Sequence, residues 1–378
     1  MARLGDLYQI TSGGTPSRKH LEYYQGGTIS WVKTGDLKEK YLWATDEKIT
    51  EIGLKNSSAR IYPKDTVLVA MYGATIGASS ILKIEAATNQ ACAAFVKRDD
   101  VMPEYLYAFL ESQQSRFIKD AVGGAQPNIS AGYLKEIDMP LIPIEEQRRI
   151  AALLDKVSDL IDKRQAQLDK LDLLVKARFV EMFGDINLND RGWNVQPLGE
   201  LCKIVRGGSP RPIEKFLGGN VPWIKIGDAT AGENIYLHAT KEHIIQEGVS
   251  KSRLVKAGSL IFANCGVSLG FARIITFDGC IHDGWLALED IDSRLDKVFL
   301  LQTLNQMTEE FRRIAPAGTQ PNLNTAIMKA YQQIIPPLQL QKNFIAFVER
   351  TGKSKLTIQQ SLDKLEILKK NLMQQYFG

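Results

Sequence analysis

Residues 30–36 read Ser-Trp-Val-Lys-Thr-Gly-Asp, and residues 222–228 read Pro-Trp-Ile-Lys-Ile-Gly-Asp. The second stretch repeats the first after 192 positions. Other matches keep almost the same offset, 194 positions, at Leu4-Gly5-Asp6-Leu7 and Leu198-Gly199-Glu200-Leu201, at Gly13-Gly14-Thr15-Pro16 and Gly207-Gly208-Ser209-Pro210, and at Gln126-Pro127-Asn128 and Gln320-Pro321-Asn322. Chance does not hold one register across a whole chain, so the sequence is a tandem duplication of a unit of roughly 190 residues.

The composition is that of a globular chain of two or three domains. At about 150 residues per domain, 378 residues are too many for one. Hydrophobic residues make up 44% and charged residues 24%, which excludes a disordered, collagen-like or fibrous chain. The net charge of +4 permits an acidic partner such as nucleic acid without requiring one.

The sequence favours a cytoplasmic protein with no membrane segment. Four cysteines with no CxxC pair are too few for a disulfide framework, so a reducing compartment is expected. The N-terminus turns polar before an apolar signal region could form. The uncharged stretch from Thr66 to Leu82 contains two glycines, and buried strands around a glycine turn explain it better than a membrane span.

Each unit begins with a globular part and ends with a long helix. Ile29–Val32 and Thr66–Met71 read as short strands and Pro103–Lys119 as a helix, which predicts an irregular α+β fold. A run free of glycine and proline then extends from Ile144 to Phe183. The second unit repeats this run after Pro337, where Gly352 predicts a local irregularity.

Apolar residues recur in both runs at alternating steps of four and three, the spacing of a coiled-coil seam. We expect the two helices to bury these seams against each other. The seam residues are Ile150, Leu154, Val157, Ile161, Leu168, Leu171 and Val175 in the first run, and Phe344, Val348, Ile358, Leu362, Leu365 and Leu372 in the second.

Motifs for catalysis are absent from the sequence. The four histidines form no HExxH zinc pair, no phosphate-binding Walker loop is complete, and no GxGxxG opens a helix after a strand. No Asn-Pro-Pro-Tyr or Asp-Pro-Pro-Tyr stretch occurs, which an amino-methyltransferase would use to hold a flipped base. We therefore expect no catalytic residue, metal or cofactor in this chain. The Gly13-Gly14 turn either cradles a phosphate or aims two strands.

The repeated turns carry residues that suit double-stranded DNA. Cations beside aromatic side chains can anchor phosphates while neighbours read base edges, although a solvated charged rim would look the same. We expect Trp31 and Trp223 to be core anchors. The candidates around the turns are Thr15, Ser17, Arg18, Lys19, Tyr23 and Lys33 in the first unit, and Arg206, Ser209, Arg211, Lys215 and Lys225 in the second.

Other candidates lie on loops where the two units match or differ. The amides of Gln126, Asn128, Gln320 and Asn322 either read adenine or brace turns. Differing side chains on a shared scaffold suit two readers of different sequences, and unlike packing would also produce them. The differing sets are Tyr72, Ala74, Thr75, Asn89 and Gln90 in the first unit, and Asn264, Val267, Ser268, His282 and Asp283 in the second.

The duplicated unit, the glycine turn, the Trp-Val/Ile-Lys-x-Gly-Asp strand, the Gln-Pro-Asn loop and the closing helices together resemble the specificity subunit of Type I restriction-modification enzymes. The resemblance covers nearly the whole chain. It implies two pseudo-symmetric target-recognition domains, residues 1–144 and 185–338. Each is followed by a long helix, residues 145–184 and 339–378, and the two helices form an antiparallel coiled coil.

The resemblance further implies a non-catalytic DNA-reading subunit. Its two domains would read the halves of a split, asymmetric site, and its helices would dock two methyltransferase subunits. Motor-nuclease restriction subunits can join such a complex. S-adenosylmethionine, ATP and magnesium would belong to those partners. Three alternatives stay open at this point: a specificity protein of another split-site DNA system, a self-contained DNA-modifying enzyme with a diverged pocket, and a coiled-coil scaffold that binds no DNA.

Overall fold

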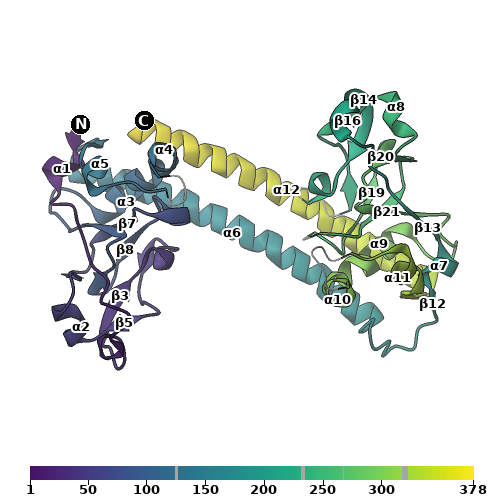
Figure 1. The fold of residues 1–378 in the computed structure, drawn as a ribbon, viewed down its shortest axis with the longest axis horizontal. Coiled ribbons are helices and arrows are strands. Elements are labelled where there is room, and N and C mark those ends of the chain that lie inside the picture. The colour runs from purple at the N-terminus through teal and green to yellow at the C-terminus, as the bar shows by residue number, and fades with distance from the viewer. Residues whose placement is uncertain (124–126, 231–234, 267, 317–321) are drawn as a thin grey trace. The chain divides into compact units, whose positions relative to one another are not determined.

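A computed structural model describes residues 1–123, 127–230, 235–266, 268–316 and 322–378. The chain forms two compact units (Figure 1). Unit 1 comprises Met1–Ala166 and Ile358–Gly378, and unit 2 comprises Gln167–Thr357. Each of the two long helices therefore contributes one segment to each unit. Among the described residues, no helix combines the length and the apolarity that crossing a membrane requires.

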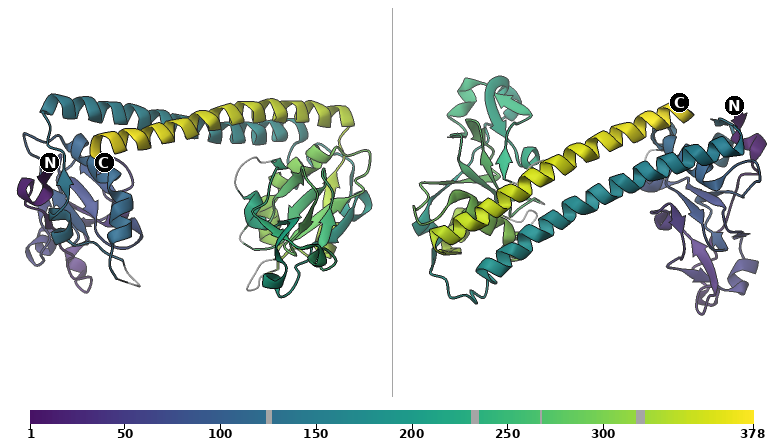
Figure 2. Two further views of the ribbon diagram at one scale, coloured as in Figure 1. Left: turned by 90° about the horizontal axis from the view of Figure 1, so that it is seen from above. Right: turned by 180° about the vertical axis from the view of Figure 1, so that it is seen from behind.

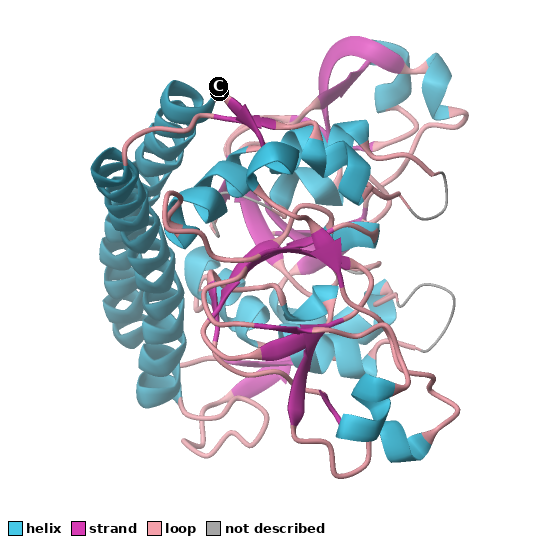
Figure 3. Cartoon of the chain, turned by 90° about the vertical axis from the view of Figure 1, so that its left-hand side faces the viewer, coloured by secondary structure: helices cyan, strands magenta, loops and turns pink. Residues whose placement is uncertain are grey.

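Unit 1 contains two mixed sheets and a two-stranded ribbon. The larger sheet has the order β2-β10-β7-β8-β4, the smaller has the order β5-β3-β9-β6, and the ribbon pairs β1 with β11. These strands are short beside the long helices (Figure 3). They span Ala2–Arg3 (β1), Thr11–Ser12 (β2), Ile29–Val32 (β3), Tyr41–Leu42 (β4), Lys48–Ile49 (β5), Ile61–Tyr62 (β6), Val67–Ala70 (β7), Ser79–Leu82 (β8), Ala86–Thr88 (β9), Cys92–Phe95 (β10) and Asp138–Met139 (β11).

The core of unit 1 lies on both faces of the larger sheet. Because side chains alternate along a strand, β7 supplies both faces, and all of its residues are buried. Val67 and Val69 pack in the cluster that holds Phe109 of the covering helix. Leu68 packs with Val32 of the smaller sheet. The uncharged stretch from Thr66 to Leu82 is thus buried strand on either side of a glycine turn, as expected.

Unit 2 repeats this architecture strand for strand. Its sheets have the orders β13-β21-β18-β19-β15 and β16-β14-β20-β17, and its ribbon pairs β12 with β22. The duplication in sequence is therefore a duplication in fold. The strands span Val195–Pro197 (β12), Lys203–Arg206 (β13), Leu217–Ile224 (β14), Tyr236–Leu237 (β15), Glu242–Ile244 (β16), Arg253–Val255 (β17), Leu260–Ala263 (β18), Ala272–Ile275 (β19), Gly279–Ile281 (β20), Trp285–Glu289 (β21) and Gln332–Ile334 (β22).

The helix expected over residues 103–119 is two helices. α3 ends at Ser112 and α4 starts at Gln114, and the matching break in unit 2 lies at Met307. The shorter helices are Leu4–Leu7 (α1), Glu51–Lys55 (α2), Pro103–Ser112 (α3), Gln114–Asp120 (α4), Ala131–Lys135 (α5), Leu198–Leu201 (α7), Gln246–Val249 (α8), Lys297–Gln306 (α9), Thr308–Ile314 (α10) and Thr325–Ala330 (α11).

The two long helices each contain 40 residues. α6 spans Ile144–Phe183 and α12 spans Leu338–Phe377. The irregularity expected at Gly352 is absent, because α12 passes through this residue without a break. Gly352 is exposed, and a Cβ there would meet nothing within 4 Å. It therefore imposes only its intrinsic helix penalty of about 1 kcal/mol, which the rest of the helix tolerates.

α6 and α12 pack against each other in opposite directions in both units. In unit 2, Lys355 Nζ donates to Asp172 Oδ1 at 2.6 Å, and the Phe179 ring lies 5.4 Å from the Phe344 ring. In unit 1, the end of α12 lies beside the start of α6 in both views of Figure 2. Every predicted seam residue is buried or half-buried.

Each globular part is completed by the C-terminal end of the long helix that belongs to the other repeat. Phe377, the last residue of α12, is 5% exposed in unit 1, with its ring 5.3 Å from Tyr105. Phe183, the last residue of α6, is fully buried in unit 2, with its ring 4.9 Å from Phe299. Because Phe183 and Phe377 are equivalent in the repeat, both units close their cores in the same way.

Buried glutamines join the start of each long helix to its globular part. Gln147 accepts from the backbone of Met102 at 2.9 Å and donates to the carbonyls of Asp100 and Ile142, both at 2.8 Å. Gln341 makes the equivalent three bonds in unit 2. A buried side chain that satisfies three backbone groups fixes the direction in which the helix leaves the domain.

Candidate nucleic-acid interface

The glycine turn of each unit packs directly against the end of a core strand. A Cβ on Gly13 would lie 1.9 Å from the carbonyl oxygen of Thr88, and one on Gly207 would lie 2.1 Å from that of His282. The Gly14 amide donates to the Thr88 carbonyl at 2.9 Å, so it is not free to cradle a phosphate. Of the two roles expected for this turn, the contacts support the structural one.

Replacing Gly13 with alanine is expected to destabilise unit 1 by about 1–3 kcal/mol, because the added methyl group would overlap backbone. Gly35→Ala is the matched control, since a Cβ at Gly35 would meet nothing within 4 Å. Thermal unfolding of both variants measures the difference. Equal midpoints would show that the turn is not tightly packed.

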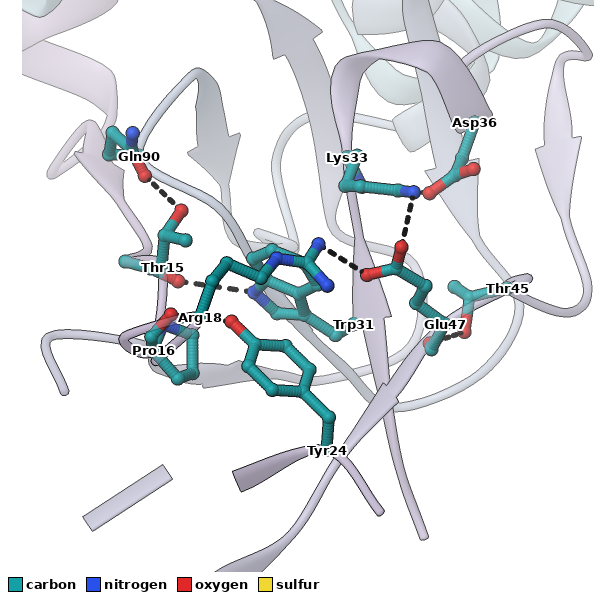
Figure 4. Close-up of polar contacts among 11 residues, drawn as sticks. Thr15, Pro16, Arg18, Tyr24, Trp31, Lys33, Asp36, Thr45, Glu47 and Gln90 are labelled. Carbon is teal, nitrogen blue, oxygen red and sulfur yellow. Dashed lines mark hydrogen bonds and ion pairs between the residues drawn. The ribbon is translucent and has the colours of Figure 1, made fainter. Parts of the chain in front are cut away.

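The tryptophans expected in the core form the floor of each turn. Trp31 is 2% exposed and Trp223 is 4% exposed. The Trp31 indole donates to the Gly14 carbonyl at 3.1 Å (Figure 4). The Arg18 guanidinium lies over the rings of Tyr24 and Trp31, 4.4 and 5.3 Å from their centroids. Thus the turn, its aromatic floor and its cation form one cluster.

Four of the candidate cations are paired with carboxylates. Glu47 binds Arg18 at 2.6 Å and Lys33 at 3.0 Å (Figure 4). Burial opposes ionisation of Glu47, but its bonds to the two cations lower its pKa overall. In unit 2, Glu242 pairs with Lys225, and Asp283 pairs with Arg211. These cations are therefore balanced locally.

The carboxylates Glu47 and Glu242 are absent from the candidates that the sequence suggested. A signal existed, because Thr45-Asp46-Glu47 and Thr240-Lys241-Glu242 match at an offset of 195. The match covers only three residues, and its offset differs by one from the offset of 194 that most other matches share.

The loop between β9 and β10 in unit 1, and the equivalent loop between β20 and β21 in unit 2, contact the glycine turn through side chains. In unit 1 the Thr15 hydroxyl donates to the amide oxygen of Gln90 (Figure 4). In unit 2 the Ser209 hydroxyl donates to Asp283 Oδ1 at 2.8 Å, and Arg211 lies 3.4 Å from Oδ2. The same two loops therefore meet at the same repeat positions, through different chemistry.

Burial and neighbouring charges set the protonation states of Asp283 and His282 in the unit 2 loop. Burial raises the pKa of Asp283, but Ser209, His282 and the nearby arginines outweigh it and lower the pKa. Burial also lowers the pKa of His282. Asp283 is thus an ionised acceptor beside a neutral imidazole at neutral pH.

Asn264 does not contact solvent, so the expectation of a DNA contact at this residue gives way to a structural role. It is fully buried, and its amide donates to Asn322 Oδ1 at 3.0 Å and to the Leu323 carbonyl at 3.2 Å. Asn322 is thereby a brace for the same loop. In unit 1 the matching Asn128 forms backbone bridges with Tyr72 and Val122.

The other candidates differ in exposure. Ser17, Lys19, Ala74 and Lys215 are exposed, as is Tyr72, whereas Tyr23, Thr75 and Ser268 are half-buried. Within the part of the chain that the structure describes, Lys19 and Lys215 form no ion pair. Arg206 donates to the Asp283 carbonyl at 3.1 Å. Gln126, Val267 and Gln320 lie outside the described residues.

The chain is similar to known proteins along most of its length. A model of the Type I restriction modification DNA specificity domain matches residues 1–172 and 190–367. The specificity subunit of the type I restriction enzyme MjaIX from Methanocaldococcus jannaschii is 28% identical over 375 residues, which cover 92% of this chain and 85% of the relative. The EcoR124I/EcoR124II specificity subunit from Escherichia coli is 26% identical over 162 residues, 42% of this chain and 40% of the relative.

Solved structures share the fold at low sequence identity. A chain from a study of complex assembly and conformational transition in the type I R-M system matches with a TM-score of 0.64 and 18% identity, covering all of this chain and 96% of that one. The type I restriction-modification S subunit from M. genitalium matches with a TM-score of 0.56 and 17% identity, covering all of this chain and 95% of that one. These similarities establish the architecture.

Proposed function

Because the chain belongs to the Type I restriction-modification DNA specificity family, we propose that its two units read the two halves of a split, asymmetric site in double-stranded DNA. The observation that carries this proposal is the repeated turn cluster. Its close-packed glycines, buried tryptophan and lysine–glutamate pair recur in both units, although only Trp31 donates to the turn, and Gln90 of unit 1 is replaced by Asp283 in unit 2. One scaffold with different polar groups suits two readers of different sequences.

We propose that the chain itself is not catalytic and that methyl transfer and cleavage belong to partner subunits. Burial raises the pKa of the Cys92 and Cys202 thiols to about 12, so both stay protonated and are poor nucleophiles. His282 uses Nδ1 to accept from the Gly284 amide at 2.9 Å, which occupies the nitrogen that a general base would need there.

Salt dependence tests DNA binding. We expect affinity for a duplex to fall linearly with salt on logarithmic axes, by roughly a thousandfold between 50 and 200 mM for about six phosphate contacts. Titration of the full chain with its partners against a labelled duplex measures this. A flat response would favour a scaffold that binds no DNA, and S-adenosylmethionine binding by the chain alone would favour a self-contained enzyme.

Exposed apolar residues on the long helices suit partner docking. Leu173 and Leu174 of α6 are 63% and 48% exposed, and the equivalent Ile367 and Leu368 of α12 are 60% and 44% exposed. The pair occurs once in each unit. Two copies of one surface suit two copies of one partner, which we propose to be the methyltransferase subunit; restriction subunits would join the resulting complex.

Placing aspartates at one pair should remove one partner of two. We expect Leu173→Asp with Leu174→Asp, or Ile367→Asp with Leu368→Asp, to leave a complex with a single methyltransferase subunit, because a charge in an apolar interface is costly. Native mass spectrometry of the purified complex counts the subunits. Leu356→Asp is the control, since Leu356 is 61% exposed but its repeat equivalent is Asp162. Two bound partners in both double variants would contradict the assignment.

A further inference from the structure

The turn between β9 and β10, and the equivalent turn between β20 and β21, each have one residue that braces the turn and a second residue that contacts the glycine turn. Asn89 Oδ1 accepts from the Ala91 amide at 3.1 Å, and His282 Nδ1 accepts from the Gly284 amide at 2.9 Å. These residues are equivalent at an offset of 193. In both, the side-chain acceptor is bonded to a backbone amide of the same turn. The next residue, Gln90 or Asp283, is instead held from outside the turn by the hydroxyl of Thr15 or Ser209.

The hydrogen bond from the Thr15 hydroxyl leaves the Gln90 amide with one donor group and one acceptor lone pair that a base can bind. Thr15 donates to Oε1, so this oxygen keeps one lone pair, and the two N–H groups of Nε2 face no partner among the described residues. Gln90 is exposed. An acceptor beside a donor matches the N6 amino group and N7 of adenine in the major groove, which glutamine can bind bidentately.

Asp283 offers the opposite chemistry. Its Oδ1 accepts from Ser209 at 2.8 Å and lies 3.0 Å from His282 Nε2, while Arg211 approaches Oδ2 at 3.4 Å. A carboxylate accepts only, and it matches the N4 amino group of cytosine. The adjacent guanidinium donates only, and it matches O6 and N7 of the paired guanine. The ion pair with Asp283 involves one Arg211 nitrogen, and the Arg211 side chain is 80% exposed, so its other donors are accessible to a base.

We propose that residues 90 and 283 are equivalent base-reading positions, with Gln90 reading adenine in the half-site of unit 1 and Asp283, together with Arg211, reading a C·G pair in the half-site of unit 2. The proposal rests on the proposed function, because it assigns bases to the two readers. Their shared tether to the glycine turn fixes each side chain before DNA arrives, which lowers the entropy lost on binding.

Two isosteric substitutions test the assignment. Gln90→Glu replaces the amide donor with an acceptor, so one base pair in the unit 1 half-site should change from A·T to C·G. Asp283→Asn supplies a donor where an acceptor is needed, so the preference for C·G at one position in the unit 2 half-site should fall roughly 10- to 100-fold. All other positions should stay unchanged. Gln25→Glu and Asp290→Asn are the controls, because they make the same charge changes at exposed residues elsewhere in the same units.

The readout is mapping of methylated sites in cells that carry each variant with its partner subunits, followed by competition between duplexes that differ at one base pair. Unit 1 keeps its fold in Gln90→Glu because the side chain is exposed. If the wild-type chain directs methylation to a split site and neither variant alters it, the base assignment is overturned while the proposed function stands. The same holds if a control alters the site equally. If the wild-type chain directs no methylation, both are overturned.

Discussion

Phe377→Ala is expected to destabilise unit 1 by about 3–5 kcal/mol and to leave unit 2 unchanged. Phe377 is the last residue of α12, yet its ring packs 5.3 Å from Tyr105 and 5.7 Å from Phe109 in the core of unit 1. Removing a buried ring loses both its transfer free energy and the packing around the cavity left behind. Phe183→Ala should have the converse effect, because Phe183 is fully buried in unit 2.

Hydrogen exchange can measure the two units separately. In Phe377→Ala the slowest amides of β7 should exchange much faster, and those of β18 should not, since local stability sets the exchange of core strands. Gln375→Ala is the control, because Gln375 is exposed on the same turn of α12. Equal acceleration in both units, or in neither, would contradict the packing described for the helix ends.

Lengthening both long helices by four residues should lengthen the spacer of the recognised site by one or two base pairs. α6 is continuous from Ile144 to Phe183, and the boundary between the units falls within it after Ala166. Four residues add about 6 Å and about one turn of helix, and one base-pair step is about 3.4 Å. Inserting them after Arg164 and after Ser361 preserves the antiparallel pairing that joins Asp172 to Lys355. Mapping of methylated sites reports the spacer.

A four-residue insertion in the loop after Leu188 is the control, because it lengthens the chain without lengthening either helix. It should leave the spacer unchanged. If the helix insertions retain activity with an unchanged spacer, the helices do not set the distance between half-sites, and their role is confined to docking.

The repeat predicted the architecture because a matched register carries over to matched elements. Ile29–Val32 is a strand, Thr66–Met71 contains β7, and the run from Ile144 to Phe183 is one helix. Trp31 and Trp223 are buried as expected. Periodicity and turn signals suffice for such elements, because burial of one face fixes them locally.

The side-chain pairing within the cluster was not predictable, because it depends on tertiary contacts. Glu47 lies on a short connection with no pattern of its own, and only the fold brings it between Arg18 and Lys33. Asn264 follows a buried strand, and nothing in the sequence distinguishes a polar residue that braces a loop from one that faces solvent. The irregularity predicted at Gly352 was wrong for a related reason, because the packing of the rest of α12 overrides the low helix propensity of a single glycine.

The central claim is that two domains of one chain read two separated sequences. The most direct test is to map all methylated sites in cells that carry this chain with its methyltransferase partner, and in cells that carry the partner alone. We predict methylation at one split, asymmetric sequence with two specific parts around a spacer of fixed length, present only when the chain is present. Methylation of a single contiguous motif, or methylation that does not depend on the chain, would contradict the claim.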